Sequence, residues 1–268
     1  MSIPLSAELL KQRRQGAAMA WGFLAVPAFA TLFAFGLELV VPAAGGAHVV
    51  ASVHPLRSAI RAVAIAGDPF AQLFYAVGAA AFFAVDYRYG TWRQIVPRNR
   101  RFALLFAKML GFALCAAASL VLLGAGDLLA SLVLPLTRGF ALTDVPPATL
   151  ASLTLAFGTS FLELLALGGT VALLATLTRS TLGALLPAFL LSFLLAGAEA
   201  LLNLSGNALA ALPLPTLAAD AVRSWIGGGD GAASVGAAAI AAAALVGWSV
   251  LTYGAAALVF ARQDLTTE

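Results

Sequence analysis

Few residues in this sequence have the types and spacing that chemistry requires. The two histidines, His48 and His54, have no acidic residue near them at the spacing of metal ligands. Cys115 lies within an apolar run without a histidine or aspartate partner, and we interpret it as a small buried hydrophobic side chain. We therefore expect no metal site and no catalytic residues, and we predict that the chain is not an enzyme.

Nucleotide-binding chemistry is also unsupported. A phosphate-binding loop needs Gly-x-x-x-x-Gly-Lys followed by Ser or Thr. The chain has two lysines, Lys11 followed by Gln12 and Lys108 followed by Met109, and neither has the glycines before it. Nucleic-acid binding has no support, because the arginines are not interleaved with a soluble fold. We expect no cofactor on this chain, and any ATP hydrolysis must take place on another polypeptide.

One carboxylate stands out because it lies near the middle of a long apolar run. Glu163 has Thr159 and Ser160 close by, and a charge at the centre of a bilayer costs about 2.5–3.5 kcal/mol. Two interpretations stay open: these three residues line a translocation path, or Glu163 is a protonated, hydrogen-bonded structural residue. Glu38, Asp127 and Glu199, toward the outer ends of their runs, either form a polar outer vestibule on an export route or are interfacial carboxylates in water, and we favour the second interpretation.

The elements that must position these residues are membrane spans. The 268 residues are 62% hydrophobic and 10% charged, whereas a soluble domain carries about 25% charged residues. A helical span needs about 20 apolar residues. We predict an all-α integral membrane protein with a single domain over 1–268 and six spans, at about 17–41, 69–86, 102–124, 148–177, 181–202 and 233–260.

The basic residues predict the orientation of these spans. With the N-terminus inside, four basic residues face outward and eleven face inward, which favours this topology. The outer set is Arg57, Arg61, Arg138 and Arg223, and the inner set is Lys11, Arg13, Arg14, Arg88, Arg93, Arg98, Arg100, Arg101, Lys108, Arg179 and Arg262. Six spans then leave both termini in the cytoplasm. The first apolar run is too long for a signal peptide, so we expect an uncleaved first span.

Several segments flank the spans. Leu5, Leu9 and Leu10 share one face of a predicted amphipathic N-terminal helix at the inner interface. The apolar spacing over 49–63 predicts a helix on the outer surface. We expect residues 124–127 to interrupt the third run. The loop at about 203–232 either dips into the membrane and returns or rests at the interface.

The loop over 86–101 is the most informative segment of the chain. It runs from Asp86 through Gly90-Thr91-Trp92 to Pro97, Arg98 and Arg100, and Lys108 follows in the next span. This pattern resembles the signature of type-2 ATP-binding-cassette (ABC) transporter permeases, although Asp86 stands where that family usually has glutamate. The motif covers about 23 residues. The six spans and the amphipathic N-terminal helix extend the resemblance to most of the chain.

The resemblance implies that this loop contains a short cytoplasmic coupling helix that docks onto a separate ATPase subunit. The expected docking residues are Asp86, Tyr87, Gly90, Thr91, Trp92, Ile95 and Val96, of which the last three would fill an apolar groove on the ATPase. An inner-face basic cluster of Arg98, Arg100, Arg101 and Lys108 would meet lipid phosphates or acidic ATPase residues, or would only set the topology.

The resemblance also implies partners and location. ATP and magnesium would bind the ATPase, and a second permease copy would complete an exporter in the bacterial cytoplasmic (inner) membrane. Two other functions stay open: a proton- or ion-coupled secondary transporter that uses Glu163, and a membrane assembly factor. The six predicted spans show neither a clear inverted repeat nor paired broken helices, which argues against the first of these.

Overall fold

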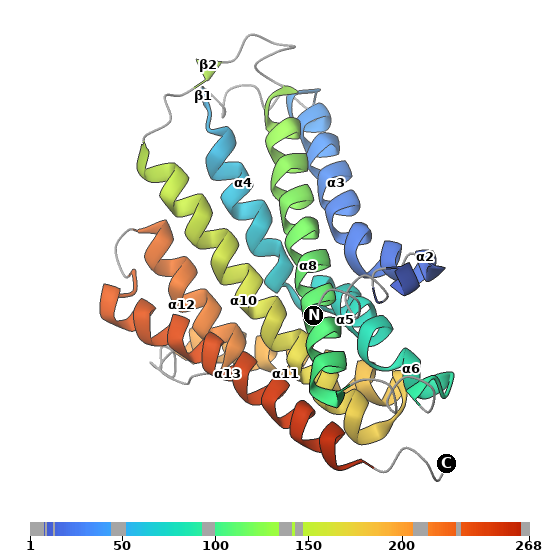
Figure 1. Ribbon diagram of the computed structural model, residues 1–268. Helices are drawn as coiled ribbons and strands as arrows, with labels where there is room; N and C mark the ends of the chain where they lie inside the picture. Colours follow the sequence, from blue (N-terminus) through green and yellow to red (C-terminus); the bar gives the residue numbers. More distant parts are fainter. Residues whose placement is uncertain are drawn as a thin grey trace.

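The computed structural model describes residues 8, 10–12, 14–43, 52–92, 100–133, 141–142, 147–205, 214–228 and 232–263. These residues form a bundle of helices with one very short strand pair (Figure 1). In chain order the elements are α2 (Gly16–Met19), η1 (Ala20–Leu24), α3 (Ala25–Ala43), β1 (Ser52–Val53), α4 (Pro55–Ala64), η3 (Ile65–Gly67), α5 (Pro69–Phe83), α6 (Val85–Arg88), α8 (Arg101–Ser131), β2 (Ala141–Leu142), α10 (Pro147–Thr178), α11 (Thr181–Ser205), α12 (Pro215–Gly227) and α13 (Val235–Arg262).

The long helices have the length and apolar composition of a multi-pass membrane protein. Among the described residues, five helices are long and apolar enough to cross a membrane, and there are six if the bent pair Pro55–Gly67 and Pro69–Phe83 is one span. Two predicted spans, 148–177 and 181–202, fall within α10 and α11, and another, 233–260, overlaps α13 from Val235 onward. The all-α prediction holds apart from β1 and β2, which pair in parallel over two residues each.

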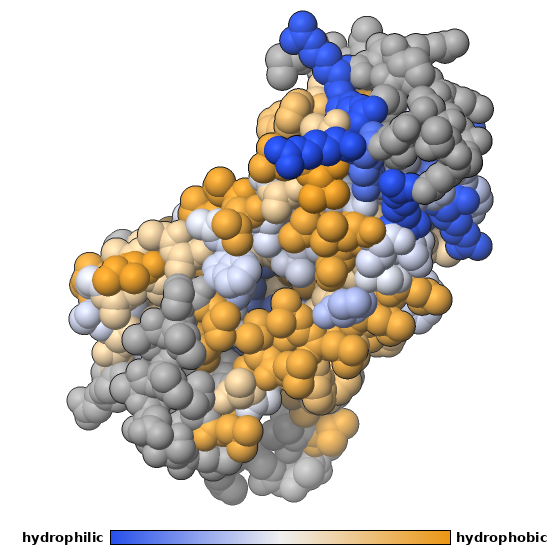
Figure 2. Space-filling model, turned by 90° about the horizontal axis from the view of Figure 1, so that it is seen from below, coloured by the Kyte–Doolittle hydropathy of each residue, from blue (hydrophilic) through white to orange (hydrophobic). Residues whose placement is uncertain are grey.

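The outward-facing side chains of the bundle are largely apolar. Large hydrophobic side chains stay exposed on α3, α11 and α13, among them Phe33, Leu194, Ile240 and Val250. The face drawn in Figure 2 is mostly hydrophobic, and its strongly hydrophilic residues gather in one part of it. Such an extended exposed apolar surface is typical of a protein that faces lipid or a partner.

The region of the predicted second span differs from our expectation. The sequence predicts a span at 69–86 after a helix that lies on the outer surface. Instead, α4 packs in the bundle against α8 and α10, with Ala59, Ala62 and Val63 buried. The chain bends by 65° between η3 and α5, where Asp68 caps the new helix and Pro69 occupies its first turn. The helix predicted from the amphipathic pattern is present as α4, but its apolar face packs against other helices and does not lie on the outer surface.

The expected interruption at 124–127 is wrong, because α8 runs without a break from Arg101 to Ser131. Gly126 lies where α8 meets α3, and a Cβ atom at Gly126 would stand only 2.0 Å from the Thr31 hydroxyl oxygen. This glycine therefore serves close helix packing and does not end the helix.

The described residues before α2, namely 8, 10–12 and 14, are helical, and the predicted amphipathic helix at the inner interface stays a prediction. Leu10 is exposed, whereas Glu8 and Gln12 are buried against the bundle. The Gln12 side-chain amide donates to the backbone carbonyl of Ala81 at 3.2 Å. Leu5 and Leu9 lie outside the described residues. This helical segment thus presents polar side chains to the bundle: Glu8 pairs with Lys108, and Gln12 bonds through its amide nitrogen, while its Oε1 has no partner among the described residues.

Candidate functional site

A buried cluster of four charged residues lies at one end of the bundle. Asp86 of α6 accepts hydrogen bonds from the ammonium groups of Lys108 in α8 and Lys11 in the N-terminal segment. The Lys108 ammonium also donates to the Phe82 carbonyl at 2.8 Å and lies 3.3 Å from the Glu8 carboxylate. The side chains of Asp86 and Lys108 are each 1% exposed. Two acids and two bases therefore neutralise one another inside the protein, which buried charges require.

Burial and the charges of this cluster shift the pKa values of two residues at this end of the bundle, Asp86 and Lys11. Burial raises the pKa of Asp86, but attraction to Lys108 and Lys11 outweighs it and lowers the pKa to about 2. Burial and the neighbouring Lys108 lower the pKa of Lys11. Because the Asp86 pKa lies below its ordinary value of 3.8, its stabilising contribution is present above that pH and is lost as the pH falls toward 2.

The turn after α6 is built on the Asp86 cluster. The Thr91 hydroxyl donates to the Asp86 carboxylate, and the Thr91 amide donates to the Asp86 carbonyl at 3.1 Å. Gly90 has φ of 61°, a left-handed conformation that glycine adopts without strain. The Gly90-Thr91 pair of the motif thus has a local structural reason: one residue turns the chain and the other holds the turn to Asp86.

Trp92 joins this turn to the end of the last helix. Its side chain is buried, and its ring lies 4.5 Å from the Phe260 ring and 5.6 Å from the Tyr87 ring, centroid to centroid. The Lys108 ammonium lies 5.1 Å from the Trp92 ring centroid, within the range of a cation–π interaction. The Trp92 ring is therefore a part of the core that links α6, α8 and α13.

Polar bonds reinforce the same junction. The Tyr87 hydroxyl donates to the Gln263 side chain at 2.9 Å, and the Gln263 side-chain amide donates to the Thr176 carbonyl at the end of α10. Arg101 donates to the carbonyls of Ala261 at 2.9 Å and Gln263 at 2.6 Å, so it caps the C-terminus of α13. We call this junction of α6, α8, α10 and α13 the Asp86 end.

The structure brings together part of the predicted docking and basic sets. Asp86, Tyr87, Thr91, Trp92 and Lys108 contact one another, and Gly90 shapes their turn. Arg101 binds the end of α13, whereas Arg100 is exposed. Ile95, Val96 and Arg98 lie outside the described residues.

Sequence reasoning missed three residues of the Asp86 end: Glu8, Lys11 as an ion-pair partner, and Gln263. Their contacts join positions that are 75 to 176 residues apart, so no local spacing indicates them. In the sequence, these residues are only polar residues next to apolar runs. Most such residues are exposed to water, so their residue types do not predict buried contacts.

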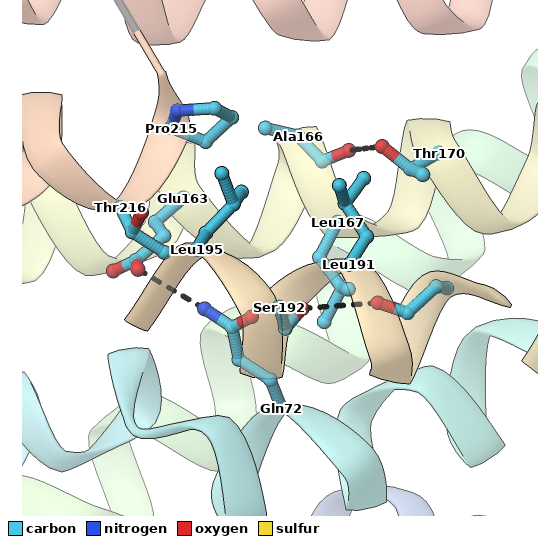
Figure 3. A pocket seen from close by; sticks show the side chains of 11 residues that line it. Gln72, Glu163, Ala166, Leu167, Thr170, Leu191, Ser192, Leu195, Pro215 and Thr216 are labelled. Carbon is cyan, nitrogen blue, oxygen red and sulfur yellow. Dashed lines mark hydrogen bonds between the residues drawn. The ribbon is translucent and has the colours of Figure 1, made fainter. Parts of the chain in front are cut away.

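A second buried charged group surrounds Glu163 in the middle of α10. The Glu163 carboxylate accepts from the Arg223 guanidinium of α12 and, at 3.0 Å, from the Gln72 side-chain amide of α5. Figure 3 shows Gln72 pointing toward Glu163, with Thr216 of α12 beside them. The Ser160 hydroxyl donates to the Val63 carbonyl of α4 at 3.0 Å. Glu163 and Ser160 therefore connect α10 to α4, α5 and α12.

The sequence predicted Glu163 and Ser160 in this group but not their partners. Thr159 donates at 2.8 Å to the Leu155 carbonyl of its own helix. Arg223 was expected in the loop at 203–232 as an outer positive charge, but α12 folds that part of the loop against the bundle. Ala218, Ala219 and Val222 of α12 pack with Ala241 and Leu245 of α13. Asp127 has one buried carboxylate oxygen without a partner among the described residues.

Two hollows flank the Glu163 group. A small cavity of about 30 Å³ lies between α5, α10, α11 and α12, and its polar lining comprises Gln72, Glu163, Thr170, Ser192 and Thr216 (Figure 3). This volume has room for about one or two water molecules. A wider cleft of about 420 Å³ opens beside the bend between α4 and α5, and Arg223 and Thr216 line it.

The fold and these two groups define the class: a multi-pass helical membrane protein with charged groups buried at one helix junction and at the bend of a broken helix pair. Comparisons with protein-family models, with curated proteins and with solved structures find no match to this chain. The evidence on the particular function of this chain is therefore the contacts of its own residues.

Proposed function

We propose that this chain is the membrane-spanning permease subunit of an ABC exporter, and that a separate ATPase docks on the 86–101 loop. The observation that carries the proposal is the buried bonding of Asp86 to Lys108, Lys11 and Thr91 directly beneath the exposed turn of the motif. A loop that only joined two spans would not need three buried charged residues and a half-buried lysine under it, because burying charges costs free energy unless they are paired.

The Asp86 end supports a coupling role for this loop. A force applied at the turn would reach α8 through Lys108 and α13 through Trp92 and Phe260. Gln263 carries the connection on to the end of α10. Packed cores and paired charges resist deformation, so movement of the loop would move these helix ends together. That is what a subunit needs if it is driven by nucleotide chemistry on another chain.

The proposed contact with the ATPase changes in one respect from the sequence prediction. Trp92 is 3% exposed, so in this conformation it supports the turn from inside. The neighbouring Tyr89 is 67% exposed at the tip of the turn and is available to a partner. We therefore assign the aromatic docking contact to Tyr89, and Ile95 and Val96 remain part of the proposed surface.

The remaining parts of the proposal follow from the exporter assignment. ATP and magnesium bind the partner ATPase, and a second copy of a permease chain faces this one in the membrane. The Asp86 end lies at the cytoplasmic side of a bacterial inner membrane, with both chain termini on that side. The excess of basic residues on this side supports the orientation.

Tyr89→Asp is expected to reduce co-purification of the ATPase about tenfold or more, because an aromatic anchor at an interface contributes about 2 kcal/mol or more. The partner to test is the ATPase with a phosphate-binding loop that is encoded beside this gene. The measurement is the amount of ATPase recovered with the tagged membrane protein.

Tyr89→Phe is the matched control, since it keeps the exposed aromatic ring and removes only the hydroxyl. Its recovery of ATPase should equal that of the wild type at equal membrane insertion. Equal recovery with Tyr89→Asp would remove the docking assignment.

A second function, a proton- or ion-coupled carrier, is favoured by one observation. Glu163 is 2% exposed and pairs with Arg223 next to the bend between α4 and α5, where helix ends meet inside the bundle. Broken helices beside a buried carboxylate are found at the substrate sites of secondary transporters.

Glu163→Gln separates the two functions, because it keeps the side-chain shape and removes the titrating group. We expect this variant to keep ATP-driven transport in inside-out vesicles whose proton gradient has been collapsed by an uncoupler. Wild-type transport that persists without ATP, stops with the uncoupler and is lost in Glu163→Gln would replace the exporter with the coupled carrier.

A further inference from the structure

The wider cleft beside the bend has an unusual set of charged residues for an apolar bundle. It has a volume of about 420 Å³ and lies between α4, α5, α11 and α12. Its charged lining is two arginines and two aspartates: Arg61, Arg223, Asp68 and Asp220. Thr216 and Ala196 complete the walls toward α12 and α11. The volume is that of a small-molecule site.

Internal bonds use only part of this polar surface. Arg223 donates to Asp220 at 2.9 Å and to Glu163, and Asp68 accepts from the Phe70 amide at 2.8 Å. The Arg223 Nε and the Thr216 hydroxyl are buried without a hydrogen-bond partner among the described residues. Buried polar atoms are normally bonded, so unpartnered ones on a cleft wall indicate a ligand.

The charges indicate what kind of ligand fits. Arg61 is exposed on α4, and within the described part of the chain it makes no ion pair. Its guanidinium, the Arg223 Nε and the Thr216 hydroxyl offer donors to an anionic group. Asp68 and Asp220 each keep a second carboxylate oxygen that can accept from a cationic N–H group. The two aspartates would repel a purely anionic ligand, and the two arginines would repel a purely cationic ligand. A molecule with one charge of each sign matches the whole set.

Apolar side chains continue outward from the cleft. Ile65 lines it and is exposed, and Phe70, the residue after the cleft residue Pro69, is exposed as well. The Phe70 ring packs edge-on against Phe193 of α11, with 6.3 Å between ring centroids, and Phe193 is also exposed. A ligand whose polar group fills the cleft would lay an attached hydrocarbon chain on these side chains.

We propose that this cleft binds the headgroup of a zwitterionic lipid that carries a phosphate and a primary ammonium, as phosphatidylethanolamine does. Arg61, the Arg223 Nε and Thr216 bind the phosphate, and Asp68 and Asp220 accept from the ammonium. The acyl chains lie over Phe70 and Phe193. This site does not depend on the proposed ATPase, because binding needs only this chain.

The test is lipid binding to the purified full-length chain in detergent, measured by native mass spectrometry. The probes are short-chain phosphatidylethanolamine, phosphatidylcholine and phosphatidylglycerol, together with soluble phosphoethanolamine. We expect phosphatidylethanolamine to bind about tenfold more tightly than the other two lipids, since phosphatidylcholine lacks N–H donors and phosphatidylglycerol lacks the cation. Arg61→Gln and Asp220→Asn should each remove this preference, and both side chains are accessible enough for the fold to tolerate the change.

Arg57→Gln is the matched control, because Arg57 is exposed on α4 one turn from Arg61 and does not line the cleft. It should keep the wild-type preference. Equal binding of the three lipids, or a preference that survives both cleft variants, would overturn the site. Soluble phosphoethanolamine that binds as tightly as the lipid would overturn the part played by the acyl chains. None of these outcomes bears on recovery of the ATPase, so this inference and the proposed function fail separately.

Discussion

Replacing Lys108 by methionine is expected to destabilise the protein by about 3–5 kcal/mol, because it strands the buried carboxylates of Asp86 and Glu8. Lys108 is the central base of the cluster: it bonds to Asp86 and the Phe82 carbonyl, and it lies beside Glu8. Lys11 alone remains to neutralise two acids. The measurement is the free energy of unfolding of the purified protein in mixed micelles.

Two further variants make the Lys108 prediction specific. Lys11→Met should have a smaller effect, because the Lys11 side chain is 26% exposed while that of Lys108 is 1% exposed. Lys108→Met combined with Asp86→Asn should recover part of the loss, since one stranded charge is then gone. A Lys108→Met protein as stable as the wild type would show that the buried cluster contributes nothing to stability and gives the docking turn no rigid support.

Arg223→Met is expected to produce a loss of similar size, about 3–5 kcal/mol, at the Glu163 group. Without Arg223 the buried Glu163 carboxylate keeps only the Gln72 amide as a donor, apart from any water in the adjoining cavity. The junction of α10 with α12 also loses its one described ion pair. The same unfolding measurement applies, and exposed-cysteine labelling of α12 would report whether this helix leaves the bundle.

The control for Arg223 is Arg61→Met. Arg61 lies on the same cleft but is exposed, so the free energy of unfolding should change by less than about 0.5 kcal/mol. Adding Glu163→Gln to Arg223→Met should restore stability, because the carboxylate that lacked a partner is then neutral. Failure of the double variant to recover any stability would mean that Arg223 acts through packing of its side chain and that the ion pair with Glu163 is incidental.

Much of the helical architecture was predictable from composition alone. The runs that became α10, α11 and α13 are long and apolar, and their ends coincide with residues that favour helix boundaries, such as Pro147 and the Ser234 cap. The same local reasoning identified Glu163 as buried, because a carboxylate within an apolar run has no water to reach. The sequence singled out Gly90 and Thr91 only as motif residues, and the turn that they form, with φ of 61° at Gly90, came from the structure.

Predictions from the sequence were wrong where one sequence pattern is compatible with two tertiary arrangements. The apolar face of α4 predicts burial against something, and it does not specify whether that is a membrane surface or the helices α8 and α10. The glycine at 126 is equally compatible with a break and with close packing against Thr31. In both cases the choice depends on which helices are neighbours, and neighbours are settled only when the whole bundle packs.

What the sequence by itself determined about this protein is therefore its helical, membrane-spanning character, the basic loop over 86–101 and the burial of Glu163. Only the tertiary structure decided the partners: Lys108 with Asp86 across 22 residues, Lys11 with Asp86 across 75, and Arg223 with Glu163 across 60. The physical reason is that the length of an apolar run is enough to predict a membrane-spanning helix from that segment alone. A buried charge, in contrast, is tolerated only where a distant helix supplies an opposite charge.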